Sequence, residues 1–268
     1  MLSSVFAKTV RDRRRGFLYW SLGIAAFIAM EAAVYPTVRS DPGFKKLGES
    51  YPEAIKGFFS FGGQFDVVSG AGFLGIEAFS AIIPLIFIFC TVAAGASAIA
   101  GEEERGTLDV LLSLPLSRSR CLLEKLAALV VEAVGLGLAL WVVLLIASPL
   151  AKMRVSAVEL LAASLLAVAL ALVFGTLALA VGAATGRRSL AIGVAASLAV
   201  ATYVVNSLAS LVSWLEHLQW LSPFYFYARS DPLRTGLDLS DLFILLAIAA
   251  VFAAAAPFLF RRRDLTTP

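Results

Sequence analysis

Five long stretches without a charged residue place the strongest limit on what this chain can fold into. They cover residues 78–101, 133–151, 160–186, 189–215 and 242–260, and each holds at least 19 residues. About 20 apolar residues form a helix long enough to cross a hydrocarbon core of about 30 Å. A sixth stretch, 16–38, is interrupted only by Glu31. The sequence therefore predicts an all-α integral membrane protein with six transmembrane helices.

The composition leaves no room for a soluble domain. Only 15% of the 268 residues are charged and 60% are hydrophobic, whereas soluble domains contain about a quarter charged residues. We expect a single transmembrane domain over residues 1–268. The predicted spans are about 16–38, 76–101, 126–150, 158–186, 189–214 and 241–260.

The positions of the lysines and arginines predict the orientation. With the N-terminus inside, the inner segments hold 14 of these cations and the outer segments hold 8. This bias follows the positive-inside rule and predicts that both termini are cytoplasmic. Residues 1–15 combine apolar residues with five cations, which is typical of an amphipathic helix on the inner membrane surface or of a simple charged anchor. Aromatic residues in 39–76 and 214–241 predict short interfacial helices on the outer side.

A polar hairpin at 101–125 separates the second span from the third. It opens with the carboxylates Glu102, Glu103 and Glu104, and Pro115 closes a short apolar segment. Leu108, Leu111 and Leu112 fall on one helical face, and Thr107 is placed to cap that helix. Part of the glycine spacing of a phosphate-binding loop is present, but the lysine that such a loop needs is absent. We therefore reject nucleotide binding by this chain.

The hairpin resembles the cytoplasmic loop of ABC-2-type permeases, the membrane subunits of one class of ATP-binding-cassette exporter. The matching positions are Glu102, Glu103, Glu104, Gly106, Thr107, Leu108, Leu111, Leu112, Pro115, Ser117 and Arg118. The resemblance implies that this coupling hairpin docks on a separate ATPase subunit. In that role Leu111 and Leu112 would supply the docking contact, and the glutamates and Arg118 would set its orientation. Alternatively, some of the glutamates cap a neighbouring helix or pair with Arg105.

The same resemblance implies the rest of the assembly. ATP and Mg would be bound by the partner ATPase, with no cofactor and no catalytic residue in this chain. A second permease copy or a close relative would complete the complex in the plasma (inner) membrane, in contact with lipid and without nucleic acid. The expected function is export, and the aromatic residues of the outer segments, rather than the resemblance, favour an amphipathic or lipophilic substrate. An ion-coupled carrier that uses Glu31, Glu77 or Glu132 and an intramembrane enzyme are the alternatives.

Polar residues inside the spans are candidates for a transport pathway. Tyr203, Asn206, Ser210 and Ser213 recur on one face of the predicted fifth span. They either line a path between two subunits or join helices by hydrogen bonds. Glu31 is expected to face protein, water or the interface, because a carboxylate in lipid is costly.

Other residues narrow the choice further. Gly175, Ala178, Gly182 and Gly186 lie near one face of the fourth span and predict close helix packing. The single His217 excludes a histidine-rich metal site, and we expect no metal site in this chain. Cys90 and Cys121 are expected to lie far from the outer face, which disfavours a structural disulfide.

Overall fold

The structure is a computed structural model that describes residues 4–50, 52, 56, 65–107, 117–209 and 212–262. In this part of the chain, six helical segments are long and apolar enough to cross a membrane, and no residue forms a strand. The six are α1 (Val5–Ser40), the continuous segment of α4 (Gly70–Leu74), η1 (Gly75–Phe79) and α5 (Ile82–Ala98), α8 (Arg118–Leu150), α9 (Ala157–Thr185), α10 (Arg188–Leu208) and α14 (Leu239–Arg262). The predicted all-α membrane fold is confirmed.

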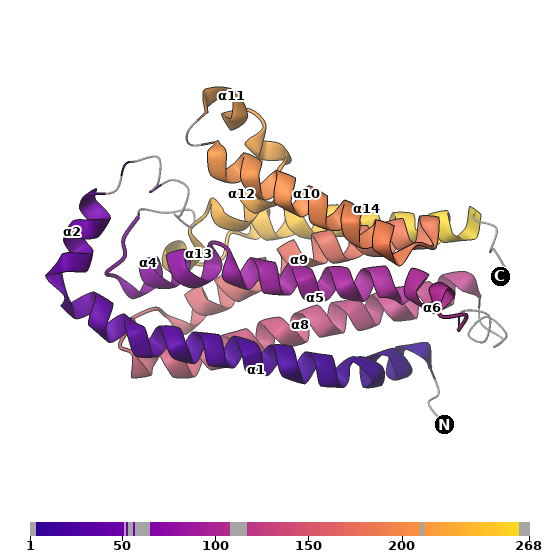
Figure 1. Ribbon diagram of the computed structural model, residues 1–268, viewed down its shortest axis with the longest axis horizontal. Coiled ribbons are helices and arrows are strands. Elements are labelled where there is room, and N and C mark those ends of the chain that lie inside the picture. The colour runs from indigo at the N-terminus through magenta and orange to yellow at the C-terminus, as the bar shows by residue number, and fades with distance from the viewer. Residues whose placement is uncertain are drawn as a thin grey trace.

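The long helices run side by side as an elongated bundle (Figure 1). Both termini lie at the same end of the bundle as α6 (Ala100–Glu104), which we call the α6 end. The opposite end carries α2 (Pro42–Ser50), α4 and α13 (Pro232–Thr235), and we call it the α13 end. The remaining short elements are α11 (Ser213–Glu216), η2 (Gln219–Leu221) and α12 (Pro223–Ala228). An even number of crossings brings both termini to one side.

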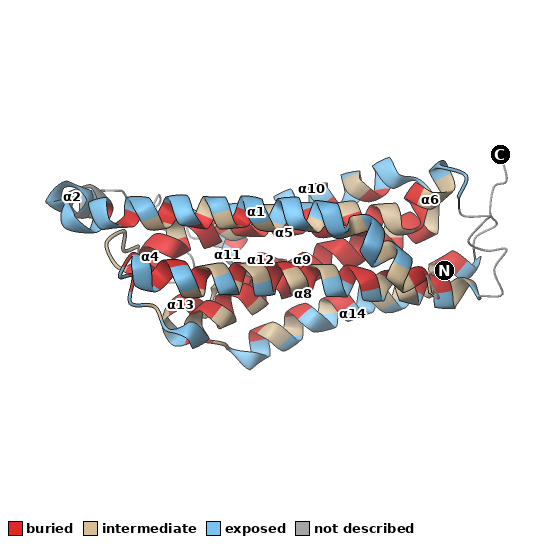
Figure 2. Cartoon of the chain, turned by 90° about the horizontal axis from the view of Figure 1, so that it is seen from below, coloured by how far each residue is buried: buried red, intermediate tan, exposed pale blue. Residues whose placement is uncertain are grey.

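Helix α9 forms the centre of the bundle. It contacts α5, α8, α10, α13 and α14. In the 18-residue stretch of α9 that is most apolar, 89% of the residues are buried inside the protein. In the most apolar 18-residue stretches of α1, α10 and α14, only 17% of the residues are buried, and the outer faces of these helices stay exposed (Figure 2). Since lipid tails are as apolar as these faces, close packing rather than the hydrophobic effect has to hold α9 in place.

Two glycines bring α5 and α9 into direct backbone contact. A Cβ atom on Gly95 would lie 2.1 Å from the carbonyl oxygen of Gly175, and a Cβ on Gly175 would lie 2.7 Å from the Cβ of Thr91. The Thr91 hydroxyl donates a hydrogen bond of 2.8 Å to the Ala171 carbonyl of α9. Close packing at Gly175 was predicted, whereas its partner Gly95 on α5 was not.

Gly186 does not contribute to that packing face. It is the C-cap of α9 and has a φ of 67°, a left-handed conformation that favours glycine. The predicted fourth span therefore ends at Thr185, and Gly186 serves the turn into α10. Gly182 does face its neighbours, with Ala96 and Ala100 within about 3.6 Å of a Cβ built there.

The N-terminal segment is part of the first span rather than a separate helix. No break occurs near residue 15, because Gly16 is the only weak helix former there and α1 continues through it. The N-terminal part of α1 packs along α8: Arg13 forms an ion pair of 2.7 Å with Glu132, and Val5 packs on Cys121. The sequence predicts a separate helix over residues 1–15 and a span that begins at residue 16, whereas the structure has one continuous helix from Val5.

The fifth span is shorter than predicted. Helix α10 ends at Leu208, and the backbone is extended at Val212 before α11 begins. Neither Pro nor Gly marks this break in the sequence. The chain turns back instead, and the Ser222 hydroxyl donates to the Thr202 carbonyl at 2.8 Å. This return buries the aromatic residues of α12, which is the tertiary reason for the early end of α10.

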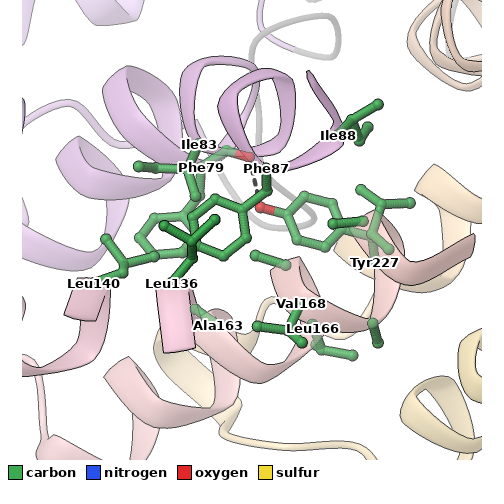
Figure 3. Close-up of a cluster of buried hydrophobic side chains, with 14 of the residues drawn as sticks. Phe79, Ile83, Phe87, Ile88, Leu136, Leu140, Ala163, Leu166, Val168 and Tyr227 are labelled. Atoms are coloured by element: carbon green, nitrogen blue, oxygen red, sulfur yellow. Dashed lines mark hydrogen bonds between the residues drawn. The ribbon is translucent and has the colours of Figure 1, made fainter. Parts of the chain in front are cut away.

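Tyr227 of α12 is one of these buried aromatic residues. Its hydroxyl donates a hydrogen bond of 2.9 Å to the Phe79 carbonyl, where η1 gives way to α5 (Figure 3). Pro84 follows shortly after and has no N–H to continue the helical ladder. Phe79 and Phe87 pack there with Leu136 of α8. The irregular second span is thus held by a side chain from far along the sequence.

The crossing of α5 and α9 leads to a prediction about stability. Gly95→Ala places a methyl group against the backbone of α9, so we expect a loss of about 1–3 kcal/mol of stability. Gly193→Ala is the matched control, because a Cβ at this α10 position meets no atom within 4 Å. Alanine there favours the helix by about 1 kcal/mol. Thermal unfolding in detergent should move in opposite directions for the two variants, and equal shifts would contradict the crossing.

Candidate coupling site

The acidic part of the hairpin forms a short helix beyond the end of the second span. Helix α5 ends at Ala98, and α6 carries Glu102, Glu103 and Glu104. Gly106 follows with a φ of 67°, which explains why the motif has glycine at this position. Residues 108–116, which include the predicted docking residues Leu108, Leu111, Leu112 and Pro115, lie outside the described residues. The chain is described again from Ser117, the N-cap of α8.

Glu102 is the centre of the contacts in this hairpin. Its carboxylate forms an ion pair of 2.9 Å with Lys125 of α8, and Arg105 lies 3.7 Å away. The Thr107 hydroxyl donates to the same carboxylate, while the Thr107 N–H donates to the Glu102 carbonyl at 2.9 Å. The Lys125 side chain is only 4% exposed, so its charge depends on this partner. Glu102 therefore joins the two ends of the hairpin.

The surroundings favour the ionised form of Glu102. Burial raises the pKa of this carboxyl, but hydrogen bonds from Thr107 and Lys125 and the charges of Lys125 and Arg105 outweigh it. The net result is a pKa below the ordinary value of 4.5. The pairing thus stabilises the fold above pH 4.5 and is lost as the pH falls through the lowered pKa.

Glu104 connects the hairpin to a third helix. Its carboxylate accepts a hydrogen bond of 2.8 Å from the Arg188 N–H, the first amide of α10. The Arg188 side chain in turn donates to the Ser97 hydroxyl at 2.9 Å. A carboxylate at a helix N-terminus is favourable, because it meets unpaired amides and the positive end of the helix dipole. Glu103 is half-buried between these two neighbours.

These contacts are the ones expected if the glutamates cap a neighbouring helix or pair with Arg105. Glu104 caps α10, and Glu102 pairs with both Arg105 and Lys125. Lys125, Arg188 and Ser97 were not among the predicted site residues. The sequence gives no local signal for the role of Lys125, since a lysine at the end of a span can also extend to the membrane interface without a carboxylate partner.

Helix α8 extends the network to α1. The Glu124 carboxylate accepts from the Phe6 N–H at 3.0 Å and lies 3.3 Å from Arg120. About two turns further along both helices, Arg13 and Glu132 form the ion pair described above. Glu132 is thus a paired structural residue rather than an available ion-binding carboxylate. Arg118 at the start of α8 lies over the Phe260 ring of α14, with 6.0 Å between its Cζ and the ring centroid.

The predicted pathway residues do not form a single stripe. Tyr203 packs its ring against Phe224, with 5.3 Å between centroids, and Asn206 is half-buried on α10. Ser210 lies outside the described residues, and Ser213 belongs to α11 beyond the break at Val212. The prediction of a continuous polar stripe from 203 to 213 was therefore wrong, because α10 ends at Leu208.

Glu31 is buried in α1, with 8% of its surface exposed, as expected of a carboxylate that avoids lipid. Glu77 is exposed in η1. Among the described residues, no group of three His, Cys, Asp or Glu side chains is placed to hold a metal ion.

The Glu102–Lys125 pair leads to a prediction about pH. Glu102→Gln removes the charge that compensates Lys125, so we expect roughly 1.5–3 kcal/mol lower stability at neutral pH. The wild type should approach the variant as the pH falls below 4.5, since protonation removes the same charge. Melting temperatures measured from pH 7 down to about pH 2 cover the range in which the lowered pKa places the convergence. Glu216→Gln, at an exposed site in α11, is the control and should show no such convergence.

The comparison with known families covers nearly the whole chain. The model of one family, described as ABC-2 family transporter protein, matches residues 3–265. No curated protein matches the sequence. The family match includes the hairpin, all six long helices and both ends of the bundle.

Proposed function

The chain belongs to the ABC-2 transporter family, and from that membership we propose that it moves a substrate out across the plasma membrane with ATP hydrolysed by a separate subunit. The resemblance drawn from the hairpin motif is thereby confirmed. Proteins of this family are the membrane components of transporters and generally lack their own ATPase. The observation that carries the proposal is the hairpin at the α6 end, which is joined to three different helices.

The contacts of the hairpin support a role in transmitting movement. Through Glu102 it is joined to α8, through Glu104 to α10, and through the chain itself to α5. Helix α8 is joined in turn to α1 by Glu124 and Glu132. A displacement of the hairpin by a partner would therefore shift several spans together. This is what a coupling element between an ATPase and a membrane path needs to do.

The orientation in this proposal places the α6 end in the cytoplasm. Both termini, α6 and the start of α8 lie at that end (Figure 1), where the sequence places 14 of the lysines and arginines. A single cysteine at Ser117 should then resist labelling from outside intact cells. Both native cysteines are buried and give little background. Labelling of Ser117→Cys from outside would reverse the orientation and remove the hairpin from the ATPase side.

We assign an amphipathic or lipophilic substrate to the transporter. Large apolar side chains are exposed on the segment that follows α10, with Trp214 65%, Trp220 60% and Leu221 78% exposed. Trp rings occupy the boundary between lipid and water, where an amphipathic molecule would leave the protein. Hydrolysis by the complete transporter, measured across a panel of amphipathic and of strongly polar compounds, separates the two classes. Stimulation by polar compounds alone would overturn this assignment.

Docking of the hairpin is tested by Leu111→Asp. The substitution puts a charge into the predicted apolar contact, and a residue central to such a contact contributes enough that binding should weaken by about tenfold or more. The measurements are pull-down of the ATPase and substrate-stimulated hydrolysis on the same preparation. Leu239→Asp makes the same chemical change at an exposed site at the start of α14, away from both the hairpin and the Trp-rich segment, and should leave both unchanged. Normal values for Leu111→Asp in an inserted protein would exclude the hairpin from coupling.

We further propose a dimer with a second copy or a close relative, formed partly by α10. Its outer face carries exposed apolar side chains, among them Leu190, Val194 and Leu198. The resemblance to ABC-2-type permeases, in which the second and fifth spans lie at the dimer interface, supports this proposal.

Crosslinking at Asn206 tests this dimer. Asn206→Cys should crosslink between subunits, because Asn206 is a polar and partly exposed residue near the end of a largely apolar helix. Phe243→Cys, on the exposed face of α14, is the control that should not crosslink. Equal yields at the two positions would indicate random collision and contradict the interface.

A further inference from the structure

A cavity of about 870 Å³ lies at the α13 end of the bundle. Its walls come from six parts of the sequence: the end of α1, Lys56, residues 65–71, residues 152–154 between α8 and α9, the start of α9, and α13. Two of the elements that line it, the end of α1 and α13, lie at the opposite end of the bundle from α6 (Figure 1). Neither the family match nor the proposed coupling mechanism gives it a role.

The lining of this cavity is strongly basic. Five cations, Arg39, Lys56, Lys152, Arg154 and Arg234, face only two carboxylates, Asp66 and Glu159. This excess is unusual at the outer end of a membrane protein, since cations normally accumulate on the cytoplasmic side.

The two carboxylates already have other partners. Asp66 lies 3.4 Å from Arg234 and accepts hydrogen bonds from the N–H groups of Val68 and Ser69. Glu159 accepts a hydrogen bond of 2.7 Å from the Ser156 N–H in the capping box of α9. Both carboxylates are therefore used to hold local structure.

Three cations are left without a carboxylate. Within the described part of the chain, Arg39, Lys152 and Arg154 have no acidic side chain within 4.0 Å. The same three residues also line a second cavity of about 610 Å³, together with Ser148, Pro149 and Val155. The cations thus border open space in both cavities.

The loop that carries two of these cations is firmly held. Lys152 and Arg154 both have left-handed backbones, with φ values of 57° and 58°. Such a conformation is unfavourable for a residue that carries a Cβ atom. Between them, Met153 is 3% exposed, and its N–H donates to the Ser148 carbonyl at 2.9 Å. The strained backbone turns both charged side chains away from the buried Met153.

Two contacts fix this loop against the other walls. The Arg39 guanidinium donates a hydrogen bond of 3.2 Å to the Lys152 carbonyl. A Cβ on Gly70 would lie 2.1 Å from the Met153 carbonyl oxygen, so only glycine allows this approach. The Tyr35 hydroxyl also donates to the Val68 carbonyl at 3.0 Å, which joins α1 to the segment before α4.

We propose that Arg39, Lys152 and Arg154 form a binding site for the phosphate group of an anionic ligand. Guanidinium groups bind phosphate oxygens through paired hydrogen bonds, and a lysine adds a compact charge. The three cations come from two elements held against each other, so the site exists before the ligand binds. The phosphate belongs either to a lipid headgroup, which lies at the depth where α1 ends, or to a soluble phosphate ester.

The test uses the full-length chain and two probes. Native mass spectrometry measures retained phosphatidylglycerol after reconstitution in lipid nanodiscs, and thermal shift in detergent measures binding of inorganic phosphate. The main variant is Lys152→Asn with Arg154→Asn, because asparagine tolerates a left-handed backbone and both charges are removed. Loss of two such charges should weaken binding by about thirtyfold.

Two further variants keep the outcome interpretable. Arg39→Gln removes the third cation from α1 without altering the loop sequence, so it should also weaken binding even if the loop variant folds poorly. Lys46→Asn removes an exposed charge from α2, at the same end of the bundle but outside the cavity lining, and should leave binding unchanged.

The outcomes decide both the site and the source of the phosphate. Retention of phosphatidylglycerol without a phosphate-induced shift assigns the site to lipid, and the reverse assigns it to a soluble phosphate. The proposal is overturned if the wild type binds neither probe, or if the cavity variants bind as well as Lys46→Asn does. None of these measurements involves the ATPase, so their failure would leave the proposed transport function standing.

Discussion

The close approach of α5 and α9 at Gly95 and Gly175 is the contact on which the rest of the bundle depends. In lipid, helices gain little from burying apolar surface, so backbone proximity and packing have to supply the attraction. The two glycines bring the helices close enough for Thr91 to donate to a carbonyl of α9. With α5 in place, α9 is surrounded by α8, α10 and α14 and stays almost entirely out of contact with lipid.

The two ends of the bundle use charge in opposite ways. At the α6 end, carboxylates and cations are paired across helices, as in Glu102 with Lys125 and Arg13 with Glu132. At the α13 end, Asp66 and Glu159 serve turns and caps and leave nearby cations facing open space. Pairing joins helices to one another, whereas unpaired charge held on a rigid loop is suited to a ligand. The same residue types therefore support coupling at one end and recognition at the other.

The sequence predicted those features that depend on the membrane itself. The number of spans follows from the uncharged runs, and the family follows from the hairpin around Gly106 and Thr107. Features decided by tertiary contacts were missed. Helix α10 stops at Leu208 because a later segment folds back onto it, and nothing local marks the position. The partners Lys125 and Arg188 and the left-handed backbone at Arg154 likewise depend on packing between segments far apart in the chain.

The ion pair between Glu102 and Lys125 also has an entropic consequence. It closes residues 102–125 into a ring, which limits the separation of Thr107 and Ser117, the described residues on either side of 108–116. A free loop loses conformational entropy when a partner fixes its ends, and that loss grows with loop length. Here the ends are brought together during folding, before any partner arrives. A protein that binds this segment therefore has to order only the residues it touches, and more of the contact energy remains available for affinity.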